Sequence, residues 1–198
     1  MRNVLELDIP GQFLESAVPL TVRKASMQDI HPLLVLINGY AAKGVMLPRT
    51  EFEMSETIRD FTLVFSGETL YGCGALHFYS PTVGEVRSLA VHPHAKSQGI
   101  GRVLVQALEQ EARQFHLHSI FAFTYVDQFF SKLGFTEVER GELPLKVWKD
   151  CLRCPKFQSC DEIAGLKHLV PPTAKAVRPR TEQPLNVTFP VLKHHPKR

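Results

Sequence analysis

The sequence lacks the features that mark membrane-spanning and exported chains. No apolar run approaches the roughly 18 residues that a bilayer-crossing helix needs. The segment from Met1 to Asp8 has no continuous apolar core and no small-residue cleavage site, so we expect no signal peptide. With a hydrophobic share of 44%, these absences predict a soluble cytoplasmic protein with no membrane partner.

Two familiar nucleotide-binding patterns are also missing. The chain contains neither Gly-x-Gly-x-x-Gly nor Gly-x-x-x-x-Gly-Lys followed by Ser or Thr. The first pattern is typical of Rossmann domains and the second of P-loop nucleotide hydrolases. The sequence therefore lacks the glycines that both classes place around a phosphate.

Cysteine is scarce, and three of the four cysteines cluster as Cys151, Cys154 and Cys160. Clustered thiols in a cytosolic protein favour metal or redox chemistry over a structural disulfide. A zinc site needs four ligands, and His168 is the one convenient fourth. We expect no metal and paired or free thiols, with zinc as the alternative. Cys73 lies in a strand pattern and is expected to be a small buried hydrophobe.

The net charge of +3 is unevenly distributed along the chain. Residues 171–198 hold six Lys and Arg residues, one acidic residue and six prolines, which predicts a disordered basic tail. A solubilising role is favoured for it, so we expect no nucleic-acid partner. Residues 1–18 are predicted to be a flexible lead-in, and 19–170 fit one domain of ordinary size.

Hydrophobic periodicity predicts an α/β chain with a central mixed, largely antiparallel sheet flanked by helices. Ser26 and Thr50 are favoured N-caps before apolar residues at helical spacing. The expected helices cover 26–43, 50–59, 98–115 and 127–133. The expected strands are 20–25, 61–65, 69–79, 85–91, 119–125, 134–139 and 161–169.

The segment 96–102 joins a strand to a helix through two glycines. Unpaired N–H groups and the helix dipole make a helix start an anion site. Gly99 and Gly101 lack a Cβ, so a phosphate can approach the main chain, and Lys96 and Arg102 can add charged contacts. An ordinary strand-to-helix turn would use the same glycines, so the flanking residues must decide.

The motif Lys96-Ser-Gln-Gly-Ile-Gly101 resembles the acyl-CoA loop of the GNAT acetyltransferases, except that lysine replaces the first Arg or Gln. The run Leu89-Ala-Val-His-Pro93 and the run Phe129-Phe-Ser-Lys-Leu-Gly-Phe135 resemble two further elements of that family. The resemblance covers about residues 20–170 and implies the GNAT fold with acetyl-CoA as co-substrate. The cofactor contacts that it implies are Leu89, Ala90, Val91, Lys96, Ser97, Gln98, Gly99, Ile100, Gly101, Arg102 and Phe130.

Glu85 is the candidate general base for acetyl transfer to an amine, because it lies on the strand that leads to the loop. Strand alternation predicts Glu85 and Arg87 on one face, with Val86, Ser88 and Ala90 on the other. An ionised carboxylate within a central strand is costly unless it is paired or used. A structural ion pair with a nearby arginine is the alternative.

The general acid is less clearly marked. Many GNAT members carry a tyrosine where this chain has Phe130, which has no hydroxyl. Thr124 and Tyr125 are the nearest hydroxyls and can donate directly or through water. A thiolate can also leave unassisted, and both residues can instead be packing residues at a strand end.

Several segments, including 22–30, 44–49 and 143–157, resemble N-acetylglutamate synthases, especially their short stand-alone members. That narrower resemblance implies direct transfer, in a ternary complex, to the α-amino group of L-glutamate, the first step towards arginine. Cationic side chains are needed to bind the two carboxylates of L-glutamate. For each candidate cation, a surface ion pair is the alternative role. The candidate acceptor contacts are Leu47, Arg49, Arg87 and Ser88, with either Lys156 or Arg153.

Other functions stay open at this point. The acceptor can be glutamine, another amino acid or a protein N-terminus, although Arg49 favours a cationic pocket over an open peptide groove. A non-catalytic acyl-CoA-binding module is supported by the missing hydroxyl at Phe130 and opposed by Glu85. The sequence is compatible with a homodimer and does not fix the oligomeric state.

Overall fold

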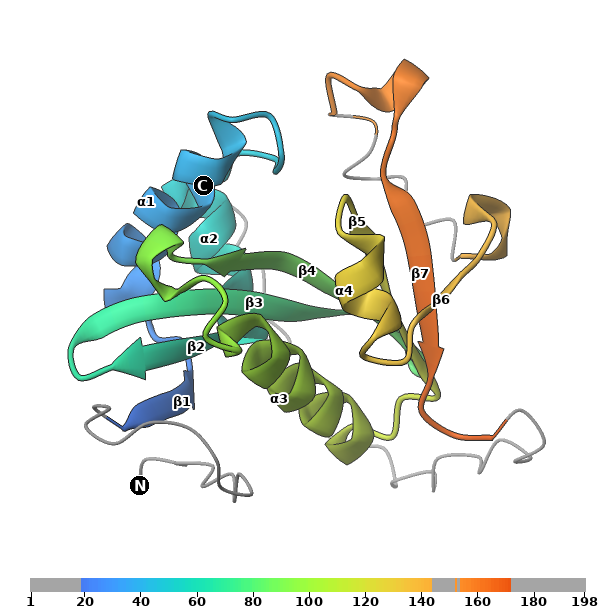
Figure 1. The fold of residues 1–198 in the computed structure, drawn as a ribbon, viewed down its shortest axis with the longest axis horizontal. Helices are drawn as coiled ribbons and strands as arrows, with labels where there is room; N and C mark the ends of the chain where they lie inside the picture. The colour runs from blue at the N-terminus through green and yellow to red at the C-terminus, as the bar shows by residue number, and fades with distance from the viewer. Residues whose placement is uncertain (1–18, 144–151, 153, 172–198) are drawn as a thin grey trace, which may run out of the picture.

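The structure is a computed structural model that describes residues 19–143, 152 and 154–171 (Figure 1). The predictions made for residues 1–18 and 172–198, Cys151 and Arg153 lie outside the described residues. The strands are β1 Leu20–Lys24, β2 Phe61–Ser66, β3 Thr69–Ser80, β4 Val83–Val91, β5 Ser119–Thr124, β6 Thr136–Glu137 and β7 Ile163–His168. The α-helices are α1 Ile30–Ala41, α2 Glu51–Thr57, α3 Ile100–Gln114 and α4 Asp127–Ser131. The short 3₁₀ turns are η1 Met27–Asp29, η2 Ile58–Asp60, η3 Pro93–Ala95, η4 Arg140–Glu142 and η6 Phe157–Ser159.

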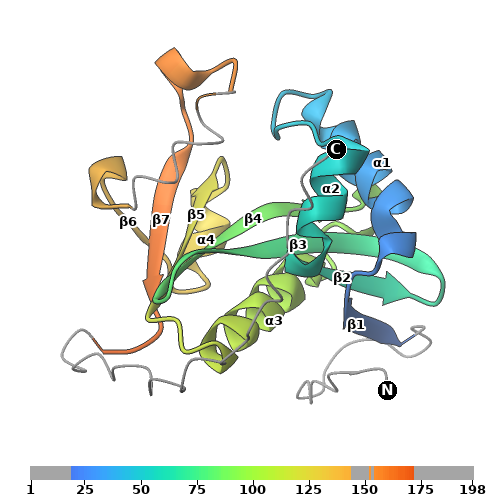
Figure 2. The same ribbon diagram turned by 180° about the vertical axis from the view of Figure 1, so that it is seen from behind.

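The strands form one seven-stranded sheet in the order β1-β2-β3-β4-β5-β7-β6. Every neighbouring pair is antiparallel except β4 and β5, which are parallel. Helices α1 and α2 pack on one face through a cluster that includes Leu33, Ile37 and Met54. Helices α3 and α4 pack on the opposite face, with Leu108 and Phe130 in their cluster (Figures 1 and 2). The predicted mixed, largely antiparallel sheet flanked by helices is confirmed.

Strands β4 and β5 pair over a short stretch and then separate. The paired residues are Val83–Glu85 of β4 and Ser119–Phe121 of β5. Strand β4 continues to Val91 paired only with β3, and Figure 1 shows β4 and β5 diverging beyond their paired stretch. Among the described residues, no strand pairs with this edge of β4 beyond Glu85. The divergence opens the sheet at the carboxyl ends of both strands.

A β-bulge in β4 corrects one prediction. Cys73 of β3 is opposite Ala90, whereas Ala75 is opposite Arg87, so β4 has one extra residue in this interval. Ser88, inside that interval, has a left-handed φ of 51°. The prediction that Ala90 shares a face with Val86 is wrong, because the extra residue inverts the alternation. Ala90 packs in the α1 cluster with Cys73 and Ala75, whereas Val86 packs in the α3 cluster.

Two other element bounds differ from the expectation for physical reasons. The helix expected over 26–43 begins as a 3₁₀ turn, in which the Asp29 carboxylate accepts hydrogen bonds from the backbone N and Oγ of Ser26. The helix expected from Gln98 begins at Ile100. Ser97 and Gly99 have positive φ values of 64° and 81°, which a right-handed helix does not allow.

Candidate functional site

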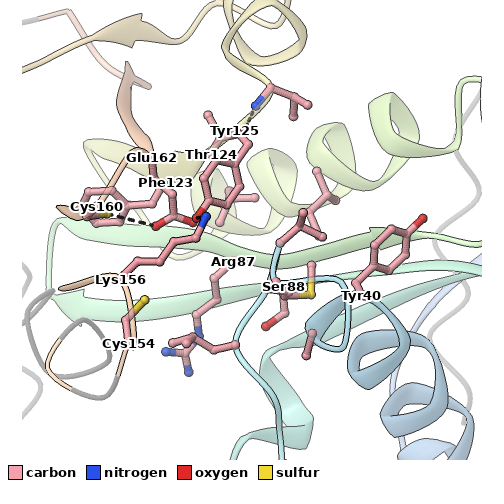
Figure 3. A pocket seen from close by; sticks show the side chains of 18 of the residues that line it. Tyr40, Arg87, Ser88, Phe123, Thr124, Tyr125, Cys154, Lys156, Cys160 and Glu162 are labelled. Carbon is pink, nitrogen blue, oxygen red and sulfur yellow. Dashed lines mark hydrogen bonds between the residues drawn. The ribbon is translucent and has the colours of Figure 1, made fainter. Parts of the chain in front are cut away.

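A cavity of about 730 Å³ lies where β4 and β5 separate. Its walls come from the α1–α2 loop, from β4, from β5 with the residues after it, and from residues 154–162 (Figure 3). The structure brings most of the predicted catalytic and acceptor residues together here, although they come from distant parts of the chain. The predicted residues that line the cavity are Leu47, Arg49, Glu85, Arg87, Ser88, Leu89, Lys96, Thr124, Tyr125, Phe130 and Lys156.

Glu85 is a nearly buried carboxylate in the cavity wall, with 8% of the residue exposed. The Tyr79 hydroxyl donates a hydrogen bond to Glu85 Oε2 at 3.0 Å. Arg87 Nη1 lies 4.0 Å from the same oxygen, an ion-pair distance that is too long for a hydrogen bond. The hydrogen bond from Tyr79 therefore fixes the orientation of the Glu85 carboxylate. Arg87 is a neighbouring cation at ion-pair distance from it.

The two candidate acids have different environments. Thr124 is buried, and its Oγ1 accepts a hydrogen bond from the backbone N of Val126 at 2.9 Å. The Tyr125 oxygen accepts a hydrogen bond from Lys156 Nζ at 3.3 Å, and that nitrogen also lies 4.8 Å from the ring centroid. Burial raises the pKa of Tyr125, so the phenol keeps its proton at neutral pH. Because Lys156 donates a hydrogen bond to the phenol oxygen, the Tyr125 O–H is left to donate in turn, and the Asp161 carboxylate lies within its reach.

Lys156 lies at the cavity wall, and its ammonium group contacts both Tyr125 and Asp161. It contacts both carboxylate oxygens of Asp161, at 3.3 and 3.4 Å. The hydrogen bond to Tyr125, followed by that to Asp161, raises the pKa of Lys156. Lys156 stays charged, yet Asp161 offsets much of the charge that an acceptor carboxylate would meet.

Two polar side chains that the sequence did not single out, Asn38 and Tyr40, hold the α1–α2 loop at Arg49 and the end of β4. Asn38 Nδ2 donates to the Arg49 carbonyl, and Asn38 Oδ1 accepts from the Arg49 backbone N, both at 2.9 Å. The Tyr40 hydroxyl donates to the Val91 carbonyl at 2.5 Å. Both side chains belong to α1, where the helical spacing of apolar residues indicates no role for either of them in the site.

The opposite wall holds groups that the sequence did not single out. Glu162 lines the cavity, and burial raises the pKa of its carboxyl. Arg140 Nη2 donates to the carbonyls of Cys160 and Glu162, at 3.0 and 2.6 Å, and so anchors the approach to β7. Cys154 also lines the cavity. No sequence spacing links Arg140 to residues twenty positions away, so only the folded chain reveals this wall.

The described residues give the zinc alternative no support. Cys154 and Cys160 are free thiols, and Cys73 is a buried free thiol as predicted. Burial raises the pKa of Cys73 to about 12, so it stays protonated. His168 lies at the far end of β7 from Cys160. In the part of the chain that the structure describes, no three His, Cys, Asp or Glu residues are placed to hold a metal ion.

The two glycines of the loop have different local reasons. Gly99 is the N-cap of α3 with a φ of 81°, and a Cβ there would meet nothing within 4 Å. A Cβ on Gly101 would lie 3.1 Å from the Phe129 ring. The missing side chain of Gly101 therefore also makes room for Phe129, and the role of Gly101 beside a phosphate stays a prediction.

Comparison with known proteins identifies the family. Residues 36–135 match the acetyltransferase (GNAT) family. A protein of Chlorobaculum tepidum described as an uncharacterized N-acetyltransferase is 37% identical over 153 residues, which cover 77% of this chain and 99% of that protein. The chain belongs to the GNAT acetyltransferase family. It is therefore an acetyl-CoA-dependent N-acetyltransferase, and the predicted fold and co-substrate are confirmed.

Other relatives of this GNAT acetyltransferase carry more specific names. An amino-acid acetyltransferase of Mycobacterium tuberculosis is 34% identical over 136 residues, covering 67% of this chain and 77% of that protein. The N-acetylglutamate synthase of Neisseria gonorrhoeae, complexed with coenzyme A and N-acetyl-glutamate, superposes with a TM-score of 0.71 and 26% identity. That match covers 79% of this chain but 36% of the synthase chain. A Mycobacterium tuberculosis structure in complex with CoA matches with a TM-score of 0.64 and 28% identity, covering 75% of this chain and 99% of that chain.

None of the described helices is both long and apolar enough to cross a membrane.

Proposed function

We propose that this acetyltransferase transfers the acetyl group of acetyl-CoA to the α-amino group of L-glutamate. The observation that carries the proposal is one cavity that combines a buried carboxylate, Glu85, with two arginines, Arg49 and Arg87. A carboxylate suits removal of the ammonium proton, and arginines suit recognition of carboxylates. The names of the relatives from M. tuberculosis and N. gonorrhoeae point to the same chemistry.

The donor side of the proposal uses β4 and the glycine loop. The edge of β4 beyond Glu85 pairs with no strand of the described sheet, so its backbone around Leu89–Val91 can pair with an extended pantetheine chain, except at the Val91 carbonyl, which accepts from Tyr40. The start of α3, with Gly99 in its left-handed conformation, directs N–H groups to a pyrophosphate. Lys96 and Arg102 flank that start and supply positive charge. Acetyl-CoA, once bound, supplies the thioester carbon that the amine attacks.

In the proposed reaction, Glu85 accepts a proton from the acceptor's ammonium group, which exposes the nitrogen lone pair. Tyr79 holds the Glu85 carboxylate through its hydrogen bond at 3.0 Å. Tyr125 is the better placed proton donor for the leaving thiolate, because it keeps its proton and lines the cavity. Thr124 also lines the cavity, and because its Oγ1 only accepts from the Val126 backbone N, its hydroxyl proton is still available, so Thr124 is the second candidate.

A second acceptor class is favoured by one specific observation. Glu162 places a second carboxyl group in the cavity wall. A carboxylate there accepts a hydrogen bond from a side-chain amide and repels a side-chain carboxylate. Glutamine would then be the preferred acceptor, with the same base and the same donor loop.

The decisive experiment measures CoA thiol release from acetyl-CoA with a panel of free amino acids and N-terminal peptides. We expect L-glutamate to give the highest kcat/KM. The highest value with L-glutamine would instead support the second candidate. Release with peptides alone would contradict both candidates. So would CoA binding without thiol release for any acceptor of the panel.

Replacing Arg49 tests the acceptor site. Arg49→Ala should raise the KM for the amino acid about tenfold or more, because a charge-assisted contact contributes roughly 1.5–3 kcal/mol. The KM for acetyl-CoA should stay nearly unchanged. Arg59→Ala is the matched control, since Arg59 is an exposed arginine outside the cavity lining. Equal increases in both KM values for Arg49→Ala would remove Arg49 from the acceptor site.

A further inference from the structure

A closed ring of polar groups lies behind Glu85. The Tyr79 hydroxyl donates to Glu85 Oε2 at 3.0 Å, and the rings of Tyr79 and His77 meet edge to face at 5.1 Å. His77 Nδ1 is 2.6 Å from Asp60 Oδ2, and that oxygen is 3.7 Å from Arg87 Nη2. Arg87 Nη1 is 4.0 Å from Glu85 Oε2, which closes the ring.

Two members of this network line the cavity, and the other three do not. Glu85 and Arg87 line the cavity, and their side chains are 11% and 12% exposed. Asp60, His77 and Tyr79 do not line it. The Asp60 and His77 side chains are 25% and 34% exposed, towards the solvent side of the ring. Asp60 and His77 therefore act on an acceptor only through Arg87 and Glu85.

The position of Arg87 determines how strong a base Glu85 is. A guanidinium that pairs closely with a carboxylate typically lowers the carboxyl pKa by about 1–3 pH units. A carboxylate with a lower pKa is a weaker base towards an ammonium group. In the structure, Arg87 lies closer to Asp60, at 3.7 Å, than to Glu85, at 4.0 Å. Asp60 thus competes with Glu85 for the same guanidinium.

We propose that Asp60, held by His77, is a positioning residue that keeps Arg87 shared between two carboxylates and so preserves Glu85 as a base. The proposal rests on the proposed function in one respect, the assignment of Glu85 as the base. It adds a role for three residues outside the cavity lining. Tyr79 fixes the Glu85 carboxylate, His77 fixes Asp60, and Asp60 restrains Arg87.

Other charged and titratable groups also face Glu85 and must be held constant in a test. From the same network, they are Tyr79 and His77 of β3, Arg87 of β4 and Asp60 of η2. The charged groups elsewhere in the cavity lining are Arg49, Lys96, Arg140, Lys156 and Glu162. Asp60 can be neutralised without changing any residue of the cavity lining.

The experiment is Asp60→Asn, with the pH profile of kcat/KM measured for the best acceptor. Arg87 should then move towards Glu85, so the acid limb should shift to lower pH by about one unit. The kcat at the optimum should fall about threefold to tenfold. Asp60→Glu should restore part of both. Asp60→Ser is a second neutral variant in case the asparagine protein does not fold.

A direct titration makes the test independent of turnover. The ¹³C shift of the Glu85 carboxyl, assigned by its loss in Glu85→Gln, should report a lower pKa in Asp60→Asn than in the wild type. Glu109→Gln is the matched control, because it removes a partly buried carboxylate whose partners, Arg113 and Lys167, are not part of this network. Glu109→Gln should leave the acid limb and the Glu85 titration in place.

The outcomes separate the two proposals. If Glu85→Gln leaves the acid limb unchanged, the base assignment fails, and the proposed mechanism with it. If Glu85→Gln removes the limb while Asp60→Asn moves neither the limb nor the Glu85 titration, the positioning role of Asp60 is overturned. A loss of thermal stability in Asp60→Asn with an unmoved limb marks Asp60 as merely structural.

Discussion

Asp29 is a buried carboxylate whose two oxygens are both used by Arg23. The two hydrogen bonds measure 2.8 Å each, and the backbone N of Ser26 donates to the same carboxylate. The bonds from Arg23 lower the pKa of Asp29 to about 2 from an ordinary value near 4. A carboxyl with a depressed pKa in the folded state stabilises the fold above pH 4, and this stabilisation is lost as the pH falls towards 2.

Asp29→Asn should therefore lower the free energy of unfolding at pH 7 by about 1–2 kcal/mol. The lower end allows for screening, because the Arg23 side chain is 36% exposed. Urea unfolding from pH 7 to pH 3 should show the difference from the wild type shrinking below pH 4. Asp161→Asn, with a 59% exposed side chain, is the control and should change little. A difference that persists undiminished at pH 3 would assign the loss to packing.

Residue types at the cavity were partly predictable, and their partners were not. Glu85 stood out because an acidic residue in a central strand needs a reason, and Arg49 because of the family resemblance. Asn38, Arg140 and Glu162 carried no local signal, since their contacts join positions far apart in sequence or depend on the cavity wall. Local patterns reveal single unusual residues, whereas the pairing of side chains across elements requires the folded chain.

At the scale of elements, the C-terminal end of α3 is a Schellman motif. The backbone N of Leu117 donates to the Ala112 carbonyl at 2.9 Å, and that of His116 to the Arg113 carbonyl at 3.0 Å. His116 is exposed and has a φ of 58°, at the position where helices favour glycine. A non-glycine residue in this conformation costs about 1–2 kcal/mol.

His116→Gly should raise the free energy of unfolding by about 0.5–1 kcal/mol, because relief of the left-handed strain exceeds the entropy cost of glycine. Thermal unfolding measures the gain, and kcat should not change because His116 lies outside the cavity lining. Gln114→Gly, two residues earlier in the last turn of the helix, should instead destabilise the protein. Destabilisation by both substitutions would refute the cap assignment.

The start of α3 offers a test of packing against the donor loop. A Cβ at Gly101 would lie 3.1 Å from the Phe129 ring, so Gly101→Ala should displace that ring and cost about 1–3 kcal/mol. The KM for acetyl-CoA should rise, and adding Phe129→Leu should recover part of both losses. Gly39→Ala is the control in α1, where a Cβ meets nothing within 4 Å and alanine should stabilise the helix. If the losses in unfolding free energy of Gly101→Ala and Phe129→Leu simply add in the double variant, the proposed clash is contradicted.

Most elements were predictable from periodicity, but the irregularities that shape the site were not. The amphipathic helix after the glycine loop and the 61–80 hairpin follow from local spacing and turn residues. The bulge around Ser88 depends on which residue of β3 lies opposite, which no local pattern records. Tyr79 lies at a second irregularity, between Phe78 and Ser80, and its hydroxyl reaches Glu85. Cross-strand register therefore sets the orientation of the proposed base.

For the whole molecule, one cavity contains the proposed base, the proposed acid and the cations that we assign to the acceptor. Direct transfer between two substrates bound together should give intersecting lines in initial-velocity plots. Mass spectrometry of the protein incubated with acetyl-CoA alone should detect no acetylated intermediate. Among the described residues, Cys154 and Cys160 are the thiols that line the cavity, and if transfer is direct, replacing both with serine should leave kcat within about threefold. Parallel lines with an acetylated cysteine would show a covalent route instead.

The short pairing of β4 with β5 has an evolutionary consequence. Three residue pairs join the two strands, and past Glu85 each strand carries its own part of the cavity. The proposed donor elements, β4 and the start of α3, belong to the first part of the sheet. Residues 154–162, with Lys156 and Glu162, belong to the part that ends in β7. Selection can therefore alter the acceptor contacts of this segment while Arg49, Arg87 and the proposed coenzyme A elements stay in place.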